Sequence, residues 1–95
     1  MSLFCQAEPC KAENDRLFGE GGHVQLMSDR DVRELMFYAR SIGLPLAWAQ
    51  HQPIPHFNLA GKFLKRVMED ARVAKLQRER FIERCRLVER NMAGQ

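Results

Sequence analysis

Cysteine and histidine residues near the N-terminus have the spacing of metal ligands. Cys5, Cys10 and His23 are separated by four and twelve residues, which matches the first three ligands of a two-cysteine, two-histidine zinc finger. The fourth ligand is missing, because residues 27–29 are Met, Ser and Asp. The aromatic residue usual in such fingers is replaced by Asn14. We therefore expect no metal site and no other cofactor.

A second group of polar residues could form a small polar site: His23, Gln50, His56 and Asn58. Histidine titrates near neutral pH and can act as a general acid or base. However, no Asp, Glu or Ser stands at a spacing typical of a proton relay with these histidines, and no phosphate-binding glycine motif is present. We expect no catalytic residues, and a small hydrolase that uses His23 and His56 is an alternative.

The C-terminal part of the chain is basic. Residues 59–95 contain ten Lys/Arg and five Asp/Glu, whereas residues 1–58 contain five Lys/Arg and seven Asp/Glu. A basic segment on a mildly acidic body suits an acidic partner, either nucleic acid or an acidic protein surface. Acidic residues are interleaved with the arginines, which favours a protein. Direct nucleic-acid binding through the basic segment is the alternative.

One long helix, residues 59–92, is predicted to carry these arginines. Its apolar or small residues recur at intervals of three and four through four heptads. These residues are Leu64, Val67, Ala71, Ala74, Phe81, Cys85, Val88 and Met92, with Arg78 as the one exception. Such a helix would be about 50 Å long, whereas a compact domain of this size has a radius of gyration near ~12 Å. We therefore predict a long basic amphipathic helix that protrudes from a small body, residues 1–58.

The second half of this helix is the predicted partner-binding surface. Its residues are Arg78, Phe81, Ile82, Arg84, Cys85, Arg86, Val88 and Met92. We expect Phe81 and Val88 to anchor in a groove of a different protein, while arginines pair with acids at its rim. A homodimer is less favoured, because two copies of Arg78 would face each other across a parallel seam.

The body is predicted to combine one packed helix with short, edge-like strands. Ser28 is a suitable N-cap, an apolar stripe follows, and Gly43 can end the helix, so we place it at residues 29–42. Short strands are expected at residues 2–5 and 23–26. The predicted fold is therefore a single α+β domain over residues 1–95, dominated by helix.

The segment between the two predicted helices, residues 46–57, is expected to be extended. Trp48 is expected to lie buried against the packed helix, as a large aromatic side chain does in a small core. Residues 53–55 are Pro-Ile-Pro and are predicted to form an exposed, rigid bracket. Asn58 is the predicted N-cap of the long helix.

The sequence also favours a particular compartment. No stretch approaches the ~20 apolar residues of a membrane span, and the N-terminus lacks the basic and apolar regions of a signal peptide. Three cysteines, an odd number, fit free thiols in a reducing environment. We expect a cytoplasmic protein that does not contact the membrane.

Several short features follow one another from His23 to Leu59: the helix that ends at Gly43, then Trp48-Ala49-Gln50, then Pro55-His56-Phe57-Asn58-Leu59. This order resembles a small family of unknown function found in phages and bacteria, whose pattern has an aspartate where this chain has Asn58. The resemblance implies a small α+β core and a phage or prophage origin. Together, the resemblance and the predicted basic helix lead to a functional hypothesis. The hypothesis is a small, non-enzymatic, phage-encoded protein that binds a host protein complex in the cytoplasm, such as a DNA-processing recombination nuclease. It would modulate that complex, with inhibition favoured over redirection.

Overall fold

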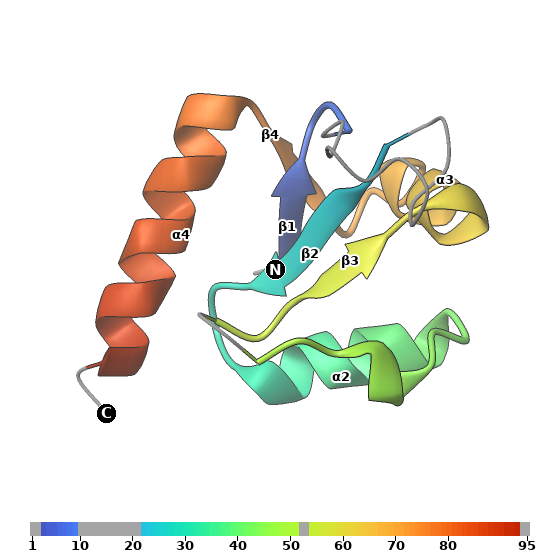
Figure 1. Cartoon of the computed structure of the whole chain (residues 1–95), viewed down its shortest axis with the longest axis horizontal. Coiled ribbons are helices and arrows are strands. Elements are labelled where there is room, and N and C mark those ends of the chain that lie inside the picture. The colour runs from blue at the N-terminus through green and yellow to red at the C-terminus, as the bar shows by residue number, and fades with distance from the viewer. Residues whose placement is uncertain (1–2, 10–21, 52–53, 94–95) are drawn as a thin grey trace.

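The computed structural model describes residues 3–9, 22–51 and 54–93 (Figure 1). It confirms the α+β class. The elements in chain order are β1 (Leu3–Gln6), β2 (Val24–Ser28), α2 (Val32–Ser41), the 3₁₀ helix η1 (Leu46–Trp48), β3 (Phe57–Leu59), α3 (Gly61–Met68), β4 (Ala74–Leu76) and α4 (Arg78–Ala93).

The four strands form one mixed sheet in the order β3-β2-β1-β4. β1 and β2 are antiparallel, with Phe4 opposite Met27, and β2 is antiparallel to β3. β4 runs parallel to β1, with Cys5 opposite Lys75. A parallel neighbour requires a crossover connection. The chain between β1 and β4 includes α2 and α3, and β4 becomes an edge of the sheet.

Each face of the sheet is covered by a separate apolar cluster. Figure 1 shows α4 on one side of the sheet and α2 and α3 on the other. The cluster under α2 and α3 includes Cys5, Leu26, Phe57 and other buried residues from both helices. The cluster under α4 consists of the buried residues Phe4, Met27, Ile54, Phe81 and Val88. Because successive strand residues point to opposite faces, Phe4 and Cys5 belong to different clusters.

The helix predicted at residues 29–42 is α2, which starts three residues later. Its N-cap is Asp31, whose Oδ1 accepts a hydrogen bond of 2.8 Å from the Glu34 amide. Ser28, the expected cap, accepts instead from the amides of Arg30 and Asp31, and so forms the turn that leads into the helix. Gly43 follows the helix with a φ of +77°, the left-handed geometry expected after its last turn.

The prediction of one helix over residues 59–92 is wrong, because the chain turns and forms a strand between Met68 and Arg78. The carboxylate of Asp70 accepts from the backbone amide of Arg72 at 2.9 Å and from the Tyr38 hydroxyl at 2.6 Å. An aspartate that bonds to nearby backbone competes with helical hydrogen bonds. Val73 is then buried and β4 pairs with β1. Tertiary contacts therefore override the helical pattern.

The linking segment also differs from its prediction. Trp48 lies on η1 and is 52% exposed, with its ring edge-on to Phe63 at 5.8 Å. Ile54, expected in an exposed bracket, is 3% exposed in the cluster under α4. Asn58 lies inside β3, and Ala60 occupies the N-cap position of α3. Pro53, Cys10 and Asn14 lie outside the described residues.

Candidate functional site

The inner face of α4 is part of the core, which corrects the prediction that this apolar strip is left for a partner. Phe81 and Val88 are 6% and 5% exposed. The Phe81 ring packs edge-on against Phe4, with ring centroids 5.6 Å apart. The reason is the break before α4: the turn and β4 bring the chain back to the sheet, so α4 packs along one side of it.

The other predicted partner-binding residues divide between packing and exposure. Cys85 is half-buried, with its sulfur 3.7 Å from that of Met27. Arg84 forms an ion pair with Asp29, and its guanidinium lies 5.8 Å from the centroid of the Phe4 ring. The exposed members are Arg78, Ile82 and Arg86. The side chain of Met92 lies outside the described residues.

A groove of about 630 Å³ runs along α4 from Arg80 to Arg90 and includes Leu76 of β4; we call it the α4–β4 groove. Its lining residues are Leu76, Arg80, Glu83, Arg84, Arg86, Leu87 and Arg90. Four arginines and one glutamate make it positively charged. Leu87, which is 49% exposed, and the half-buried Leu76 provide apolar surface between the charges.

The predicted partner-binding surface left out three groove residues, Arg80, Leu87 and Arg90, although the two arginines belong to the basic segment considered for nucleic acid. These three residues are seven and three residues apart, so on a helix they share one face. The signal was present on the polar side of the helix, but the predicted surface combined the apolar stripe with Arg78, Arg84 and Arg86 only. The groove also needs Leu76, and no helical periodicity could place a strand residue beside α4.

The candidate polar site is spread along two strands. His56 and Gln50 are brought together by two backbone hydrogen bonds of 2.8 Å. The buried ring of His56 places Nδ1 2.7 Å from the Ile54 carbonyl oxygen. His23 precedes Val24, which pairs with Leu59, so the two histidines lie about 13 Å apart at 3.3 Å per strand residue. That separation is too large for both to act on one substrate atom.

The zinc-finger spacing does not bring its ligands together either. Cys5 is fully buried in the cluster under α2 and α3. Strand alternation places His23 on the opposite face from Val24, which belongs to that same cluster. Across the part of the chain that the structure describes, no three His, Cys, Asp or Glu side chains are grouped so that they could hold a metal ion.

The turn between α3 and β4 holds an electrostatic cluster of Tyr38, Asp70 and Arg72. The guanidinium of Arg72 donates to Asp70 at 2.8 Å and lies 5.1 Å from the centroid of the Tyr38 ring. Hydrogen bonds from Arg72 and from the Tyr38 hydroxyl hold the pKa of the Asp70 carboxyl well below its usual range. Burial and the donated bond to Asp70 raise the pKa of Tyr38. The cluster fixes the turn that directs the chain into β4.

Both cysteines that the structure describes are poor nucleophiles. Burial raises the pKa of Cys5 to about 11, and burial together with the charge of Glu89 raises the pKa of Cys85 to about 11. The thiolate is the reactive form of cysteine. At neutral pH each side chain is therefore a packed thiol and is unsuited to nucleophilic catalysis.

No protein-family model, curated protein or solved structure matches this chain. The resemblance at residues 23–59 therefore stays a prediction. None of the helices in the described segments combines the length and the hydrophobicity that crossing a bilayer requires. The α4–β4 groove combines concavity, positive charge and the exposed apolar side chain of Leu87.

Proposed function

We propose that this protein is an interaction module that binds an acidic surface of another protein through the α4–β4 groove. The observation that carries this proposal is the arrangement of Arg80, Arg86 and Arg90 around the exposed side chain of Leu87. Arginine is enriched in the centres of protein interfaces, where its planar fork can bind carboxylates in pairs. An apolar side chain between such arginines supplies the area that a desolvated contact needs.

The helix that carries the groove, α4, is packed on the sheet, so the groove is present before a partner binds. Phe81 and Val88 fix the inner face of α4 to the sheet, and the ion pair of Arg84 with Asp29 ties the helix to the turn after β2. A side chain that is held by a packed helix loses less conformational freedom on binding. The arginines of the groove are therefore presented at defined positions on one element.

The biological setting of this proposal comes from the sequence resemblance. A phage-type protein of this size that lacks a recognisable catalytic set would act by occupying a surface of a host complex and inhibiting it. A host DNA-processing complex, such as a recombination nuclease, is the first partner class to test. Free thiols at Cys5 and Cys85 fit the proposed cytoplasmic location.

Site-specific photo-crosslinking tests the proposal. A photoreactive amino acid at position 87 lies in the groove, and one at position 82 serves as the matched control on the same helix, outside the groove lining. Crosslinks should form in nuclease-treated host lysate from position 87 and not from position 82. The crosslinked protein should then bind the purified chain with an affinity that falls as salt rises.

Charge reversal provides the second arm of this test. Arg86→Glu with Arg90→Glu should abolish the crosslink at position 87, whereas Arg33→Glu with Arg40→Glu on α2 should leave it unchanged. A crosslink that forms in untreated lysate but not in nuclease-treated lysate would show that nucleic acid is the groove's ligand. A crosslink between two copies of the chain would show that the groove is a dimer interface. Either result contradicts the proposal.

A further inference from the structure

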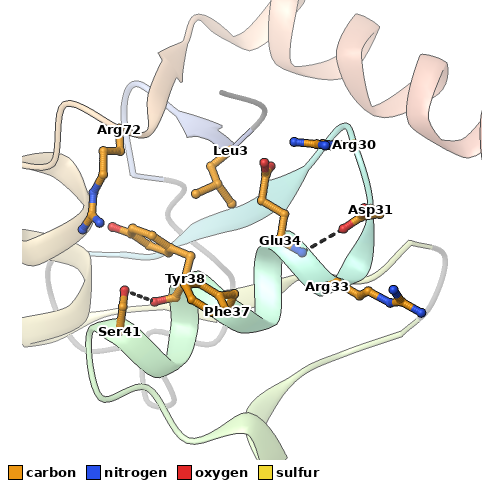
Figure 2. A pocket seen from close by; sticks show the side chains of 9 residues that line it. All are labelled: Leu3, Arg30, Asp31, Arg33, Glu34, Phe37, Tyr38, Ser41 and Arg72. Carbon is orange, nitrogen blue, oxygen red and sulfur yellow. Dashed lines mark hydrogen bonds between the residues drawn. The ribbon is translucent and has the colours of Figure 1, made fainter.

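The outer face of α2 carries a second surface, away from the α4–β4 groove. Phe37 is 79% exposed, the most exposed large apolar side chain among the described residues. It points outward from the middle of a ten-residue helix (Figure 2). An aromatic ring exposed to this extent contributes little to the fold, because most of its area still faces water.

Arginines flank Phe37 on the same side of the helix. Arg33 lies four residues before it and Arg40 three residues after it, which are the spacings that bring helical side chains together. Both arginines are exposed. Within the described segments, the ion pairs involve only Arg72 and Arg84, so the charges of Arg33 and Arg40 face solvent.

A hollow of about 420 Å³ lies beside Phe37. It is within the size range of about 300–1,000 Å³ that small-molecule sites occupy. Tyr38 and Arg72, which stack on each other, line it together with Arg30 and Ser41 (Figure 2).

Two carboxylates also line the hollow, and they restrict where an anion can bind. Asp31 caps the helix, and Glu34 accepts a hydrogen bond of 2.8 Å from the Ser28 hydroxyl. Their charges disfavour a phosphate inside the hollow. Phe37 also lines the hollow and stays free for an uncharged, planar group, while the phosphates are left to Arg33, another lining residue, and to Arg40, which lies outside the lining.

We propose that the α2 face binds single-stranded nucleic acid, with a base stacked on Phe37 and neighbouring phosphates held by Arg33 and Arg40. Proteins that bind single strands combine exposed aromatic rings with cations that follow the backbone. Along the helix axis, the Cα atom of Arg33 lies about 6 Å before that of Phe37 and the Cα atom of Arg40 about 4.5 Å after it, at 1.5 Å per residue. A duplex hides its base faces within the stack, whereas a single strand leaves them accessible to Phe37. This surface is independent of the α4–β4 groove.

Fluorescence anisotropy with the purified full chain tests this inference. The probes are a labelled single-stranded oligonucleotide of about 15 nucleotides, in DNA and RNA forms, and a duplex of the same length. Single strands should bind more tightly than the duplex. Phe37→Ala should weaken binding about tenfold or more, and Phe37→Tyr should restore it, because each stacked base contributes about 1–3 kcal/mol.

The salt dependence and a control variant complete the test. Arg33→Gln should reduce the slope of log affinity against log salt by about 0.7, the value for one single-strand phosphate contact. Arg86→Gln in the α4–β4 groove should leave both affinity and slope unchanged. The inference is overturned if no single strand binds at about 50 mM salt. It is also overturned if Phe37→Ala binds as the parent does, if Arg86→Gln loses binding equally, or if a free mononucleotide binds as tightly as the oligonucleotide.

Discussion

Replacing Phe81 with alanine tests whether α4 is part of the folded core. In the structure, the Phe81 side chain is 6% exposed and packs against Phe4 and the other buried residues under α4. If α4 protruded, as its apolar stripe suggested, the same substitution would remove only solvent-exposed area. The two arrangements therefore differ in the change in the free energy of unfolding.

The expected magnitude follows from burial. Truncating a buried phenylalanine to alanine costs about 3–5 kcal/mol, which combines lost transfer energy with the cavity left behind. A domain of 95 residues has a total stability of about 5–14 kcal/mol at the usual value per residue. The substitution should thus remove a large fraction of the stability. At about 4–8 °C per kcal/mol for a domain of this size, Tm should fall by at least about 12 °C.

Thermal unfolding followed by circular dichroism measures this shift, with Ile82→Ala as the matched control. Ile82 is the next residue on α4 and is 41% exposed, so its replacement should change stability by about 0.5 kcal/mol or less. Alanine also has the higher helix propensity, which partly offsets lost contacts. Equal and small shifts for Phe81→Ala and Ile82→Ala would refute the packing of α4 on the sheet.

Two further predictions concern titratable groups. The folded-state pKa of Asp70 is depressed, so its contribution to stability is present above the unfolded pKa of about 3.9 and is lost as pH falls through the folded value. Denaturant titrations should therefore show that Asp70→Asn is less stable than the parent at neutral pH. The difference in the free energy of unfolding should shrink below about pH 5. A difference that does not depend on pH would contradict a stabilising role of the ionised Asp70 carboxylate. Because burial raises the pKa of Cys5 and Cys85 to about 11, iodoacetamide should label both much more slowly at pH ~8 in the native protein than in the unfolded chain. Rapid native labelling of Cys5, followed by peptide mass spectrometry, would show that its burial is wrong.

The parts of the fold that sequence reasoning predicted correctly depend on local signals. For α2, an apolar stripe, a cap and a glycine after the last turn all lie within about fifteen residues. The start was misplaced because Ser28 and Asp31 are both good caps, and only the turn geometry decides between them. The position of β2 was also predicted approximately, from a short apolar run after the glycines.

The parts that sequence reasoning missed depend on contacts between distant residues. Asp70 is held by the Tyr38 hydroxyl, 32 positions earlier, and β4 pairs with β1, about 70 positions earlier. A local sequence pattern cannot indicate contacts over such distances. In addition, the apolar residues between positions 64 and 76 fit a helical stripe well, which favoured a helix there. The one warning was Arg78 at a core-type position. In the structure it is the exposed first residue of α4, where a new helix begins with its own phase.

The two faces of α4 differ in burial, so substitutions on the exposed face can test the proposed binding without loss of the fold. The inner face, with Phe81 and Val88, closes the core, while Arg86 and Arg90 are exposed and belong to no ion pair within the described residues. Residues that share no contacts contribute nearly additively to stability. Charge reversal at Arg86 and Arg90 should therefore leave Tm within a few degrees of the parent, so that a lost crosslink at position 87 reports the groove itself. Phe81→Ala would destabilise the fold and remove binding together, so a lost crosslink in that variant would not report the groove.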